Sequence, residues 1–377
     1  MTLRIVQVNC VIDESRRAPA DLFAAWPTLS ATADAAAHAG ADVTVLQASR
    51  VPGEYRDRGV TYRFVAEPRW QRGNGAGSMP WRIGAAIRRV RPDVVHFNGL
   101  DFPFHVRAAC SAGAPVLVQD HASRAEGRSA RLRAWGHEKI AGVAFTARAQ
   151  AEPFLRRHQL PRSAQLFEVP ESSSHFTPGD RDAARRACGI YGAPALLWIG
   201  HLDANKNPLT MLHGVRTALA TLPDLHVWCA FAGIGLLGEI EALLRADPRL
   251  AGHVHLLGTV PHPAIETLCR AADLFVSTSR REGSGYALIE ALACGMTPVI
   301  SDIPSFRALT GHGALGALVP VGDADALAAA IIDQAQRPRE AARAAVRAHF
   351  EQHLAFDAIG AQLMAAYRAI ATPTTRP

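Results

Sequence analysis

The chain has 377 residues, of which 49% are hydrophobic and 20% are charged, and its formal net charge is +6. This length suffices for two domains with separate cores, and the scattered Gly and Pro leave no long low-complexity segment. No apolar run approaches the roughly 20 residues of a membrane-spanning helix, and the first residues have the pattern of a strand, which argues against a secretory signal.

Short apolar runs alternate with helical patterns along the first half of the chain. Each run is apolar almost throughout, which is typical of a parallel sheet covered on both faces. Alternating strands and helices predict right-handed crossovers and a doubly wound sheet. Strands are predicted at residues 4–8, 42–47, 62–66, 94–97, 115–119 and 143–146, and helices at residues 20–39, 81–91, 105–112 and 147–158.

The second half repeats this pattern, and a polar, turn-rich segment separates the two halves. We therefore predict an α/β protein with two Rossmann-like doubly wound domains that face each other across a cleft. The predicted parts are an N-terminal domain at 1–170, a linker at 171–180, a C-terminal domain at 181–345 and a helical tail at 346–377 that packs back on the first domain. Strands are predicted at residues 195–199, 226–232, 254–257, 274–277 and 297–301, and helices at residues 208–221, 237–246, 264–271, 286–294 and within 341–371.

The placement of charged residues and cysteines limits the possible binding partners and the cellular compartment. Residues 1–170 carry 23 Lys and Arg against 15 Asp and Glu, whereas residues 171–377 carry 17 against 19. A basic first half favours an anionic partner, although an Arg-rich coding bias would give the same surface. The six cysteines include no C-x-x-C pair. This spacing favours reduced thiols in a cytoplasmic protein over disulfides or a zinc site.

The most informative segment is residues 279–299, which follows a predicted strand and opens a helix. Gly283 and Gly285 allow a tight turn and a close approach of the backbone to a ligand. The free amides at the start of the helix then favour a diphosphate. Glu282 and Glu290 flank this position, and ionised carboxylates accept hydrogen bonds from hydroxyls. The alternative is a structural strand–turn–helix corner with two solvated glutamates.

This segment resembles the signature of the family 4 retaining glycosyltransferases, whose two Rossmann-like domains form the GT-B fold. The resemblance implies that Glu290 binds the ribose hydroxyls of a donor nucleotide and that Glu282 is catalytic, beside the transferred sugar. It also implies that the amides of residues 285–287 bind the diphosphate. The matching residues are Glu282, Gly283, Gly285, Glu290, Ala291, Ala293, Gly295, Pro298 and Val299.

Residues 196–208 resemble the family segment in which an arginine after a glycine, and a lysine five residues later, bind the diphosphate. Lys206 matches the lysine, but His201 occupies the arginine position. Imidazole cannot make the bidentate contact of a guanidinium. Val260 matches a strand end beside the nucleotide base, with plain core packing as the alternative. The donor residues implied are Gly200, His201, Lys206, Val260, Gly283, Ser284, Gly285, Tyr286, Ala287 and Glu290.

The first domain is expected to bind the acceptor. Asp120 and His121 follow a predicted strand, and the resemblance implies that one of them contacts the donor sugar or orients the acceptor. The register does not decide between them, and a purely structural loop role is the alternative. His96 is interpreted as structural. The loop after the first strand lacks the family's glycines, and residues 67–82 form an Arg- and Trp-bearing loop suited to an anionic or lipid acceptor or a membrane surface.

The resulting hypothesis is a cytoplasmic hexosyltransferase that uses a UDP- or GDP-sugar with retention and needs neither a cofactor nor a metal. The expected acceptor is a glycan, a lipid-linked molecule or a small molecule, with peripheral contact at the inner membrane face as an option and no nucleic-acid partner. The alternatives are an inactive nucleotide-sugar-binding relative and a nucleotide-sugar epimerase. A dehydrogenase is disfavoured because no G-x-G-x-x-G follows an early strand.

Overall fold

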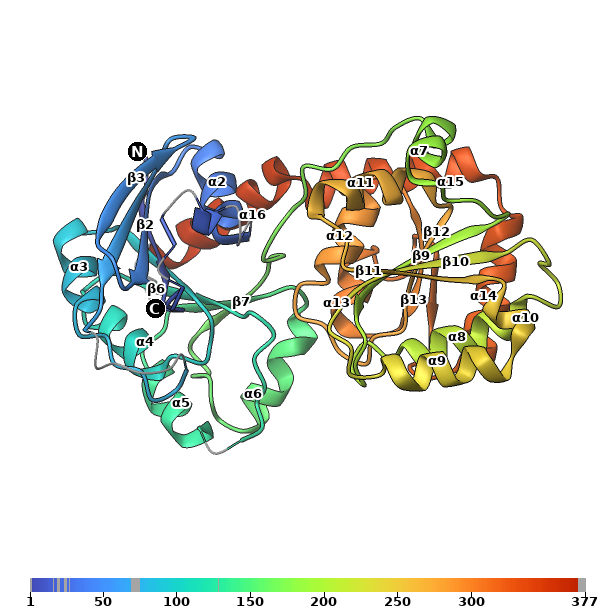
Figure 1. The fold of residues 1–377 in the computed structure, drawn as a ribbon. Coiled ribbons are helices and arrows are strands. Elements are labelled where there is room, and N and C mark those ends of the chain that lie inside the picture. Colours follow the sequence, from blue (N-terminus) through green and yellow to red (C-terminus); the bar gives the residue numbers. More distant parts are fainter. Residues whose placement is uncertain are drawn as a thin grey trace. The chain divides into compact units, whose positions relative to one another are not determined.

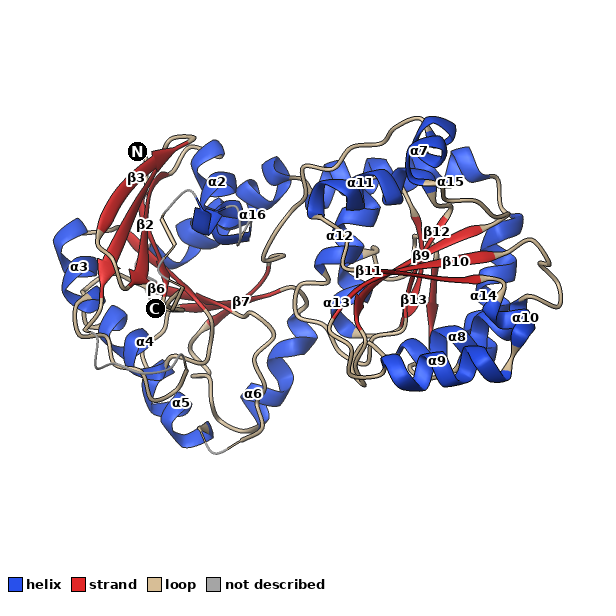
Figure 2. Ribbon diagram, in the orientation of Figure 1, coloured by secondary structure: helices blue, strands red, loops and turns tan. Residues whose placement is uncertain are grey.

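The computed structural model describes residues 2–15, 17–18, 21–23, 26, 28–68, 75–127 and 129–371. The chain forms two compact units (Figure 1). Unit 1 comprises Met1–Ser172 and Phe356–Pro377, and unit 2 comprises Ser173–Ala355. Each unit holds one sheet covered by helices on both faces, as Figure 2 shows. This arrangement confirms the predicted α/β class with two Rossmann-like doubly wound domains.

The sheet of unit 1 has eight strands in the order β3-β4-β2-β1-β5-β6-β7-β8. All neighbouring strands are parallel except the antiparallel hairpin of β3 and β4. The two strands that the sequence did not predict, β3 and β8, are the edge strands, which carry exposed or half-exposed residues and lack an apolar run. The bounds are β1 Arg4–Asn9, β2 Asp42–Ser49, β3 Gly53–Asp57, β4 Val60–Ala66, β5 Val94–Asn98, β6 Val116–Gln119, β7 Gly142–Phe145 and β8 Gln165–Glu168.

Alternating residues of the unit 1 strands supply two hydrophobic cores. Val6 and Val8 pack with α3 and α4 in one core, whereas Ile5 packs with α2 and α16 in the other. Helix α16 approaches α2 closely, because a Cβ on Gly360 would lie 2.3 Å from the carbonyl oxygen of Ala35. The helices of unit 1 are α2 Thr28–His38, α3 Ile83–Val90, α4 Pro103–Cys110, α5 Ala130–His137, the 3-10 turn η1 Arg148–Ala151, α6 Glu152–Arg156 and α16 Phe356–Ala371.

The sheet of unit 2 has six parallel strands in the order β11-β10-β9-β12-β13-β14. The strands are β9 Ala195–His201, β10 His226–Ala232, β11 Val254–Gly258, β12 Leu274–Ser277, β13 Thr297–Ser301 and β14 Ala317–Val319. The helices are α7 Arg181–Cys188, α8 Pro208–Ala218, α9 Leu237–Ala246, α10 Pro248–Ala251, α11 His262–Ala271, α12 Tyr286–Ala293, α13 Pro304–Leu309, α14 Ala324–Gln336, α15 Arg339–His349 and the π-helical turn η2 Phe350–Leu354.

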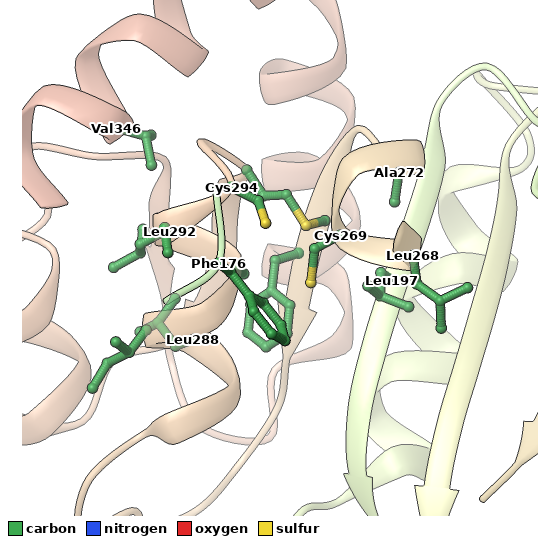
Figure 3. Close-up of a cluster of buried hydrophobic side chains, with 14 of the residues drawn as sticks. Phe176, Leu197, Leu268, Cys269, Ala272, Leu288, Leu292, Cys294 and Val346 are labelled. Atoms are coloured by element: carbon green, nitrogen blue, oxygen red, sulfur yellow. The ribbon is translucent and has the colours of Figure 1, made fainter. Parts of the chain in front are cut away.

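The predicted tail, residues 346–377, is divided between the two units. Val346, Phe350 and Leu354 belong to the core of unit 2, part of which Figure 3 shows beside α12. The Ser173 hydroxyl donates a hydrogen bond of 2.6 Å to the carbonyl of Leu354. Apolar packing therefore places the boundary at Phe356, and the predicted linker from Ser173 onward is part of unit 2.

A buried carboxylate, Asp273, joins four segments at the amino ends of the unit 2 strands. It accepts hydrogen bonds from the amide of Ala195 at 2.8 Å and from Arg185 at 2.9 Å. Arg181 and Arg339 lie 2.8 and 3.4 Å from its other oxygen. One carboxylate thus links α7, β9, β12 and α15, which makes the group structural in role. Among the residues that the structure describes, no helix is long and apolar enough to cross a membrane.

We predict that the buried imidazole of His105 makes unit 1 sensitive to acid. Among the described residues, neither ring nitrogen of His105 has a hydrogen-bond partner, and burial lowers the pKa of His105 to about 4. In the unfolded chain His105 binds a proton near pH 6.5, whereas in the folded protein it stays neutral until about pH 4. The free energy of unfolding is therefore unaffected by this group above pH 6.5 and falls as the pH drops below that value. His105→Leu should remove a penalty of about 2 kcal/mol at pH 5.

Denaturant unfolding at pH 7 and pH 5 measures this effect. His38→Gln is the matched control, because the His38 side chain is 73% exposed. The wild type and the control should lose more stability between the two pH values than His105→Leu. An identical loss in all three proteins would contradict the assignment.

Candidate functional site

A pocket of about 400 Å³ lies in unit 2 at the carboxyl ends of β9 and β10. Ligands of doubly wound sheets bind at this edge, because the loops that follow the strands converge there. The pocket brings together most of the residues that the sequence singled out. They are Gly200, His201, Lys206, Val260, Glu282, Ser284, Tyr286, Ala287 and Glu290, with Ile199, Ala230, Phe231, Ala232, Thr259, His262 and Ile265 completing the lining.

Two loops of the pocket are tied to each other by hydrogen bonds. The amide of Arg280 donates to the carbonyl of Asn205 at 2.8 Å, and the Asn205 side chain donates to the carbonyl of Arg281 at 3.0 Å. The Thr278 hydroxyl donates to the carbonyl of Lys206 at 3.1 Å. These bonds hold the β9–α8 loop against the β12–α12 loop, although more than 70 residues separate them along the chain.

The tied loops place the Lys206 ammonium 2.6 Å from the Glu282 carboxylate. Both side chains are largely buried, with 23% and 13% of their surfaces exposed. An ion pair this sheltered is screened less by salt than a surface pair. The pocket therefore holds a fixed positive group and a fixed negative group in contact.

The turn before α12 requires a glycine at position 285 for a steric reason. Gly285 precedes α12 with φ +63°, and a Cβ there would lie 2.9 Å from Leu309. Gly283 and Gly285 are buried and are not among the lining residues, so they shape the backbone that presents Ser284 and Tyr286 to the pocket. The amide of Leu288 already donates to the Gly285 carbonyl at 2.9 Å. The amides that precede it have no intrahelical acceptor and can bind an anion.

Glu290 lies one turn inside α12 and is 3% exposed. Its carboxylate contacts Nε2 of His262, the first residue of α11. This hydrogen bond raises the pKa of His262, and burial followed by the Glu290 charge raises the pKa of Tyr286. No motif in the sequence marks His262, because a histidine after a proline at a helix start has no pattern of its own.

His201 presents only one of its ring nitrogens to a ligand. Its Nδ1 lies 2.8 Å from the carbonyl oxygen of Ala232, so this nitrogen carries a proton. The neutral ring then offers an acceptor at Nε2, and only the protonated ring can donate there. The side chain at the family's arginine position can therefore offer a hydrogen-bond donor to an anion only when the ring is protonated.

In unit 1 the two candidate residues at the end of β6 have different surroundings. Asp120 is 7% exposed, and its carboxylate accepts a hydrogen bond of 3.0 Å from the amide of Ser123, so it closes the turn. Burial raises its pKa to about 6. His121 instead lines a pocket of about 500 Å³. Only His121 is therefore placed to meet a ligand of this pocket.

His121 is held by two partners. Nε2 lies 3.0 Å from Asn98 Oδ1, and Nδ1 contacts the Glu171 carboxylate. Burial lowers the pKa of His121, but the charge and hydrogen bond of Glu171 outweigh it and raise the pKa overall. The sequence places Glu171 only in the predicted linker, because no local pattern indicates its contact with His121, which lies 50 residues earlier in the chain.

His96 and Glu67 have structural roles, and part of the predicted loop at residues 67–82 lies outside the described residues. His96 is buried, its Nδ1 is 2.6 Å from the Tyr367 hydroxyl, and burial lowers its pKa to about 3. The Glu67 carboxylate accepts a hydrogen bond of 2.9 Å from the amide of Ile83 at the start of α3. Residues 69–74 of the predicted Arg- and Trp-bearing loop lie outside the described residues.

Comparison with protein families gives two matches that together span most of the chain. A family described as Glycosyltransferase Family 4 matches residues 28–164, and one described as Glycosyl transferases group 1 matches residues 180–349. The chain belongs to the group 1 glycosyltransferases of family 4. The glycosyltransferase is similar over 295 residues to a phosphatidyl-myo-inositol mannosyltransferase of Mycolicibacterium smegmatis, at 28% identity. This match covers 74% of the chain and 71% of the relative.

A second relative is a D-inositol 3-phosphate glycosyltransferase of Geodermatophilus obscurus, at 34% identity over 65% of the chain. The match spans 58% of that relative, less than two thirds of its length. Among solved structures, sucrose-phosphate synthase of Thermosynechococcus elongatus superposes with a TM-score of 0.70 at 19% identity, over 98% of the chain and 99% of that protein. Anabaena HepE in complex with UDP and glucose superposes with a TM-score of 0.65 at 16% identity, over 97% and 100%. These structures show the GT-B fold.

We predict that His201→Arg tightens the binding of UDP or GDP roughly tenfold, because a guanidinium is always charged and bonds a phosphate through two N–H groups. Isothermal titration calorimetry at pH 7.5 measures the change. Gln336→Arg, on the exposed end of α14, adds the same charge away from the pocket and should leave the affinity unchanged. Equal gains in both variants would show that net charge alone is responsible.

Proposed function

We propose that this glycosyltransferase moves a hexose from a UDP- or GDP-sugar, bound in the pocket of unit 2, to an acceptor bound by unit 1. One observation carries the proposal: Lys206, Glu282, the start of α12 and Glu290 line a single pocket of about 400 Å³. A cation and helix amides suit a diphosphate, and a carboxylate at each side suits hydroxyl groups. Along the chain, Glu282, the start of α12 and Glu290 follow one another in the order in which this proposal assigns them to sugar, diphosphate and ribose.

In this proposal Lys206 and the first amides of α12 bind the diphosphate and stabilise it as the leaving group. A divalent cation is then not required, and turnover that survives EDTA would agree with this. Glu290 accepts hydrogen bonds from the ribose hydroxyls. Glu282 faces the transferred sugar and stabilises the positive charge that develops on its ring in the transition state.

We further propose transfer with retention of the anomeric configuration. The acceptor hydroxyl attacks the anomeric carbon from the face that the diphosphate leaves, and a phosphate oxygen takes the hydroxyl proton. No side chain is then needed as a general base. A proton NMR spectrum of the product, in which the anomeric coupling constant differs between the two configurations, tests this assignment.

The acceptor side of the proposal rests on the unit 1 pocket and on the relatives. The relatives named above act on inositol-containing acceptors according to their names. Peripheral contact of unit 1 with a membrane stays a prediction. It draws on Trp135, which is 42% exposed and carries the Arg107 guanidinium 4.6 Å from its ring centre.

Lys206→Met is expected to weaken UDP binding about tenfold or more while leaving uridine binding within twofold. The reason is that the lost ammonium contacts the diphosphate and not the nucleoside, and a charged hydrogen bond contributes about 1.5–3 kcal/mol. Titration calorimetry with UDP, UMP and uridine gives the comparison. Equal losses for UDP and uridine would instead indicate a collapsed pocket.

Substitutions of the two glutamates should have different effects, one on donor binding and the other on the chemical step. Glu290→Gln is expected to raise the KM for the donor, because the amide accepts fewer hydrogen bonds from ribose, whereas Glu282→Gln should lower kcat at least 100-fold with a smaller change in KM. Release of UDP or GDP from a panel of donors and acceptors is the assay. Glu241→Gln, on the exposed side of α9, is the control. Full activity of Glu282→Gln would show that Glu282 has no catalytic role.

The same assay distinguishes the competing functions. Free nucleoside diphosphate that forms only when an acceptor is present supports transfer. Interconversion of two nucleotide-sugars without release of nucleotide would identify an epimerase. Tight donor binding with no turnover on any acceptor would identify an inactive binding protein.

A further inference from the structure

A second cavity of unit 2 lies at the opposite edge of its sheet from the pocket described above. Its volume is about 380 Å³, and its lining includes Pro194, which precedes β9, with Leu274 and Thr297, which begin β12 and β13. The pocket described above is lined instead by the last residues of β9 and β10. Parallel strands begin at one edge of a sheet and end at the other, so the two cavities are separate.

Arginine side chains dominate the charge of this cavity. Among the described residues that line it, the cationic ones are Arg181, Arg337 and Arg339. Arg181 begins α7, Arg337 follows α14, and Arg339 begins α15. The same lining contains one anionic side chain, Asp273. The lining residues therefore carry two more positive charges than negative ones.

The carboxylate of Asp273 is already shared among several donors. It contacts Arg181 at 2.8 Å, Arg185 at 2.9 Å, Arg339 at 3.4 Å and the amide of Ala195 at 2.8 Å. One negative charge thus serves three guanidinium groups. Each guanidinium has five N–H donors, and Asp273 accepts from only one or two of them in each case. Donors and positive charge therefore remain for a further anion.

Like charges are crowded around this carboxylate. Burial lowers the pKa of Arg185, and the charges of Arg181 and Arg339 lower it further. The charge of Asp273 offsets these effects only in part. Burial also lowers the pKa of Arg343, and the charge of Arg339 adds to that effect. An anion between the guanidinium groups would reduce their mutual repulsion, which favours its binding.

Three further carboxylates pair with the arginines from the protein surface, at distances of 2.9 to 3.6 Å. They are Asp182, Asp333 and Glu340, whose side chains are 75%, 59% and 79% exposed. These three are not among the described lining residues of the cavity. Ion pairs with such exposed groups are screened by salt and contribute little, so the cavity itself stays positive.

The uncharged part of the lining is mostly apolar. Its apolar members are Ala193, Pro194, Leu222, Leu274, Ala335 and Ala342. A volume of about 380 Å³ exceeds that of a single phosphate ion and falls within the range of small-molecule sites, about 300–1,000 Å³. The cavity therefore has room for an organic group beside an anion.

We propose that this cavity binds a phosphate monoester, with the phosphate among Arg181, Arg337 and Arg339 and the organic group against the apolar wall. A guanidinium bonds a phosphate through two N–H groups at once. A monoester carries about two negative charges above pH 7, which match the excess of the lining, whereas a carboxylate carries one. The site is additional to the proposed transferase reaction and does not depend on it.

Titration calorimetry of the full chain with phenyl phosphate at pH 7.5 and low ionic strength tests the proposal. Arg337→Gln should weaken binding at least fivefold, because it removes one of the three cations. The Arg337 side chain is 57% exposed and pairs with Asp333 one helical turn earlier, so the core is not disturbed. Arg245→Gln is the matched control, because Arg245 is 71% exposed and pairs in the same way with Glu241 on α9. The control should change the affinity by less than twofold.

Arg339→Gln is the second variant, and it should also weaken binding at least fivefold. Its contact with Asp273 is the longest of the three guanidinium contacts, so Asp273 keeps its closer partners. Thermal melting confirms that each variant is folded, and Arg337→Gln carries the test if Arg339→Gln does not fold.

Three smaller probes separate the parts of the ligand. Inorganic phosphate should bind more weakly than phenyl phosphate, because it lacks the organic group. Phenol and acetate at the same concentration should not displace phenyl phosphate, because neither carries the dianion. Equal affinity for inorganic phosphate and phenyl phosphate would overturn the monoester assignment, and displacement by acetate would overturn the selection of a dianion.

The other pocket of unit 2 is a competing site for phosphate, and Lys206→Met removes its cation. The losses caused by Arg337→Gln and Arg339→Gln should persist when they are combined with Lys206→Met. The proposal is overturned if phenyl phosphate does not bind at millimolar concentration, if both arginine variants bind it as the wild type does, or if Lys206→Met alone abolishes binding.

These outcomes are separate from the proposed transferase function, which is read from UDP or GDP binding and from sugar transfer. A protein that transfers sugar but does not bind phenyl phosphate through these arginines would keep the proposed function and lose this second site. A protein that binds phenyl phosphate here but binds no nucleotide would lose the proposed function and keep the site.

Discussion

The hydrogen bonds between the β9–α8 loop and the β12–α12 loop are the constraint on which the pocket of unit 2 depends. Asn205 is bonded through both its carbonyl oxygen and its side chain, and Thr278 is bonded to the carbonyl of Lys206. Without these bonds a lysine on a flexible stem would have no fixed position relative to Glu282. Because loops that follow parallel strands meet at one edge of the sheet, a few backbone bonds suffice to assemble the site.

In both units the charged groups that line a pocket are already paired. Lys206 contacts Glu282 and His262 contacts Glu290 in unit 2, and His121 contacts Glu171 in unit 1. A buried charge without a partner is costly, and these pairs avoid that cost. A ligand with charges or hydroxyls in matching positions exchanges these contacts for its own. Selectivity then depends on how well the ligand replaces them.

The fold was largely predictable where burial makes the sequence periodic. Helix α9 was predicted with its observed bounds, and β10 likewise, because their apolar patterns are long and uninterrupted. The edge strands β3 and β14 were missed, since the first is exposed throughout and the second has three residues. The boundary at Phe356 was also missed, because the apolar pattern of a helix indicates that it is buried but not which core buries it.

The family and the turn before α12 could be recognised from the sequence, because Glu282, the two glycines and Glu290 follow one another within a single strand–turn–helix unit. Which distant residues meet them depends on how the chain folds. The fold paired His262 with Glu290 and placed His121, but not Asp120, in the lining of the unit 1 pocket. Such contacts join strands that are far apart along the chain, and strand order and register, which no local pattern encodes, bring them together.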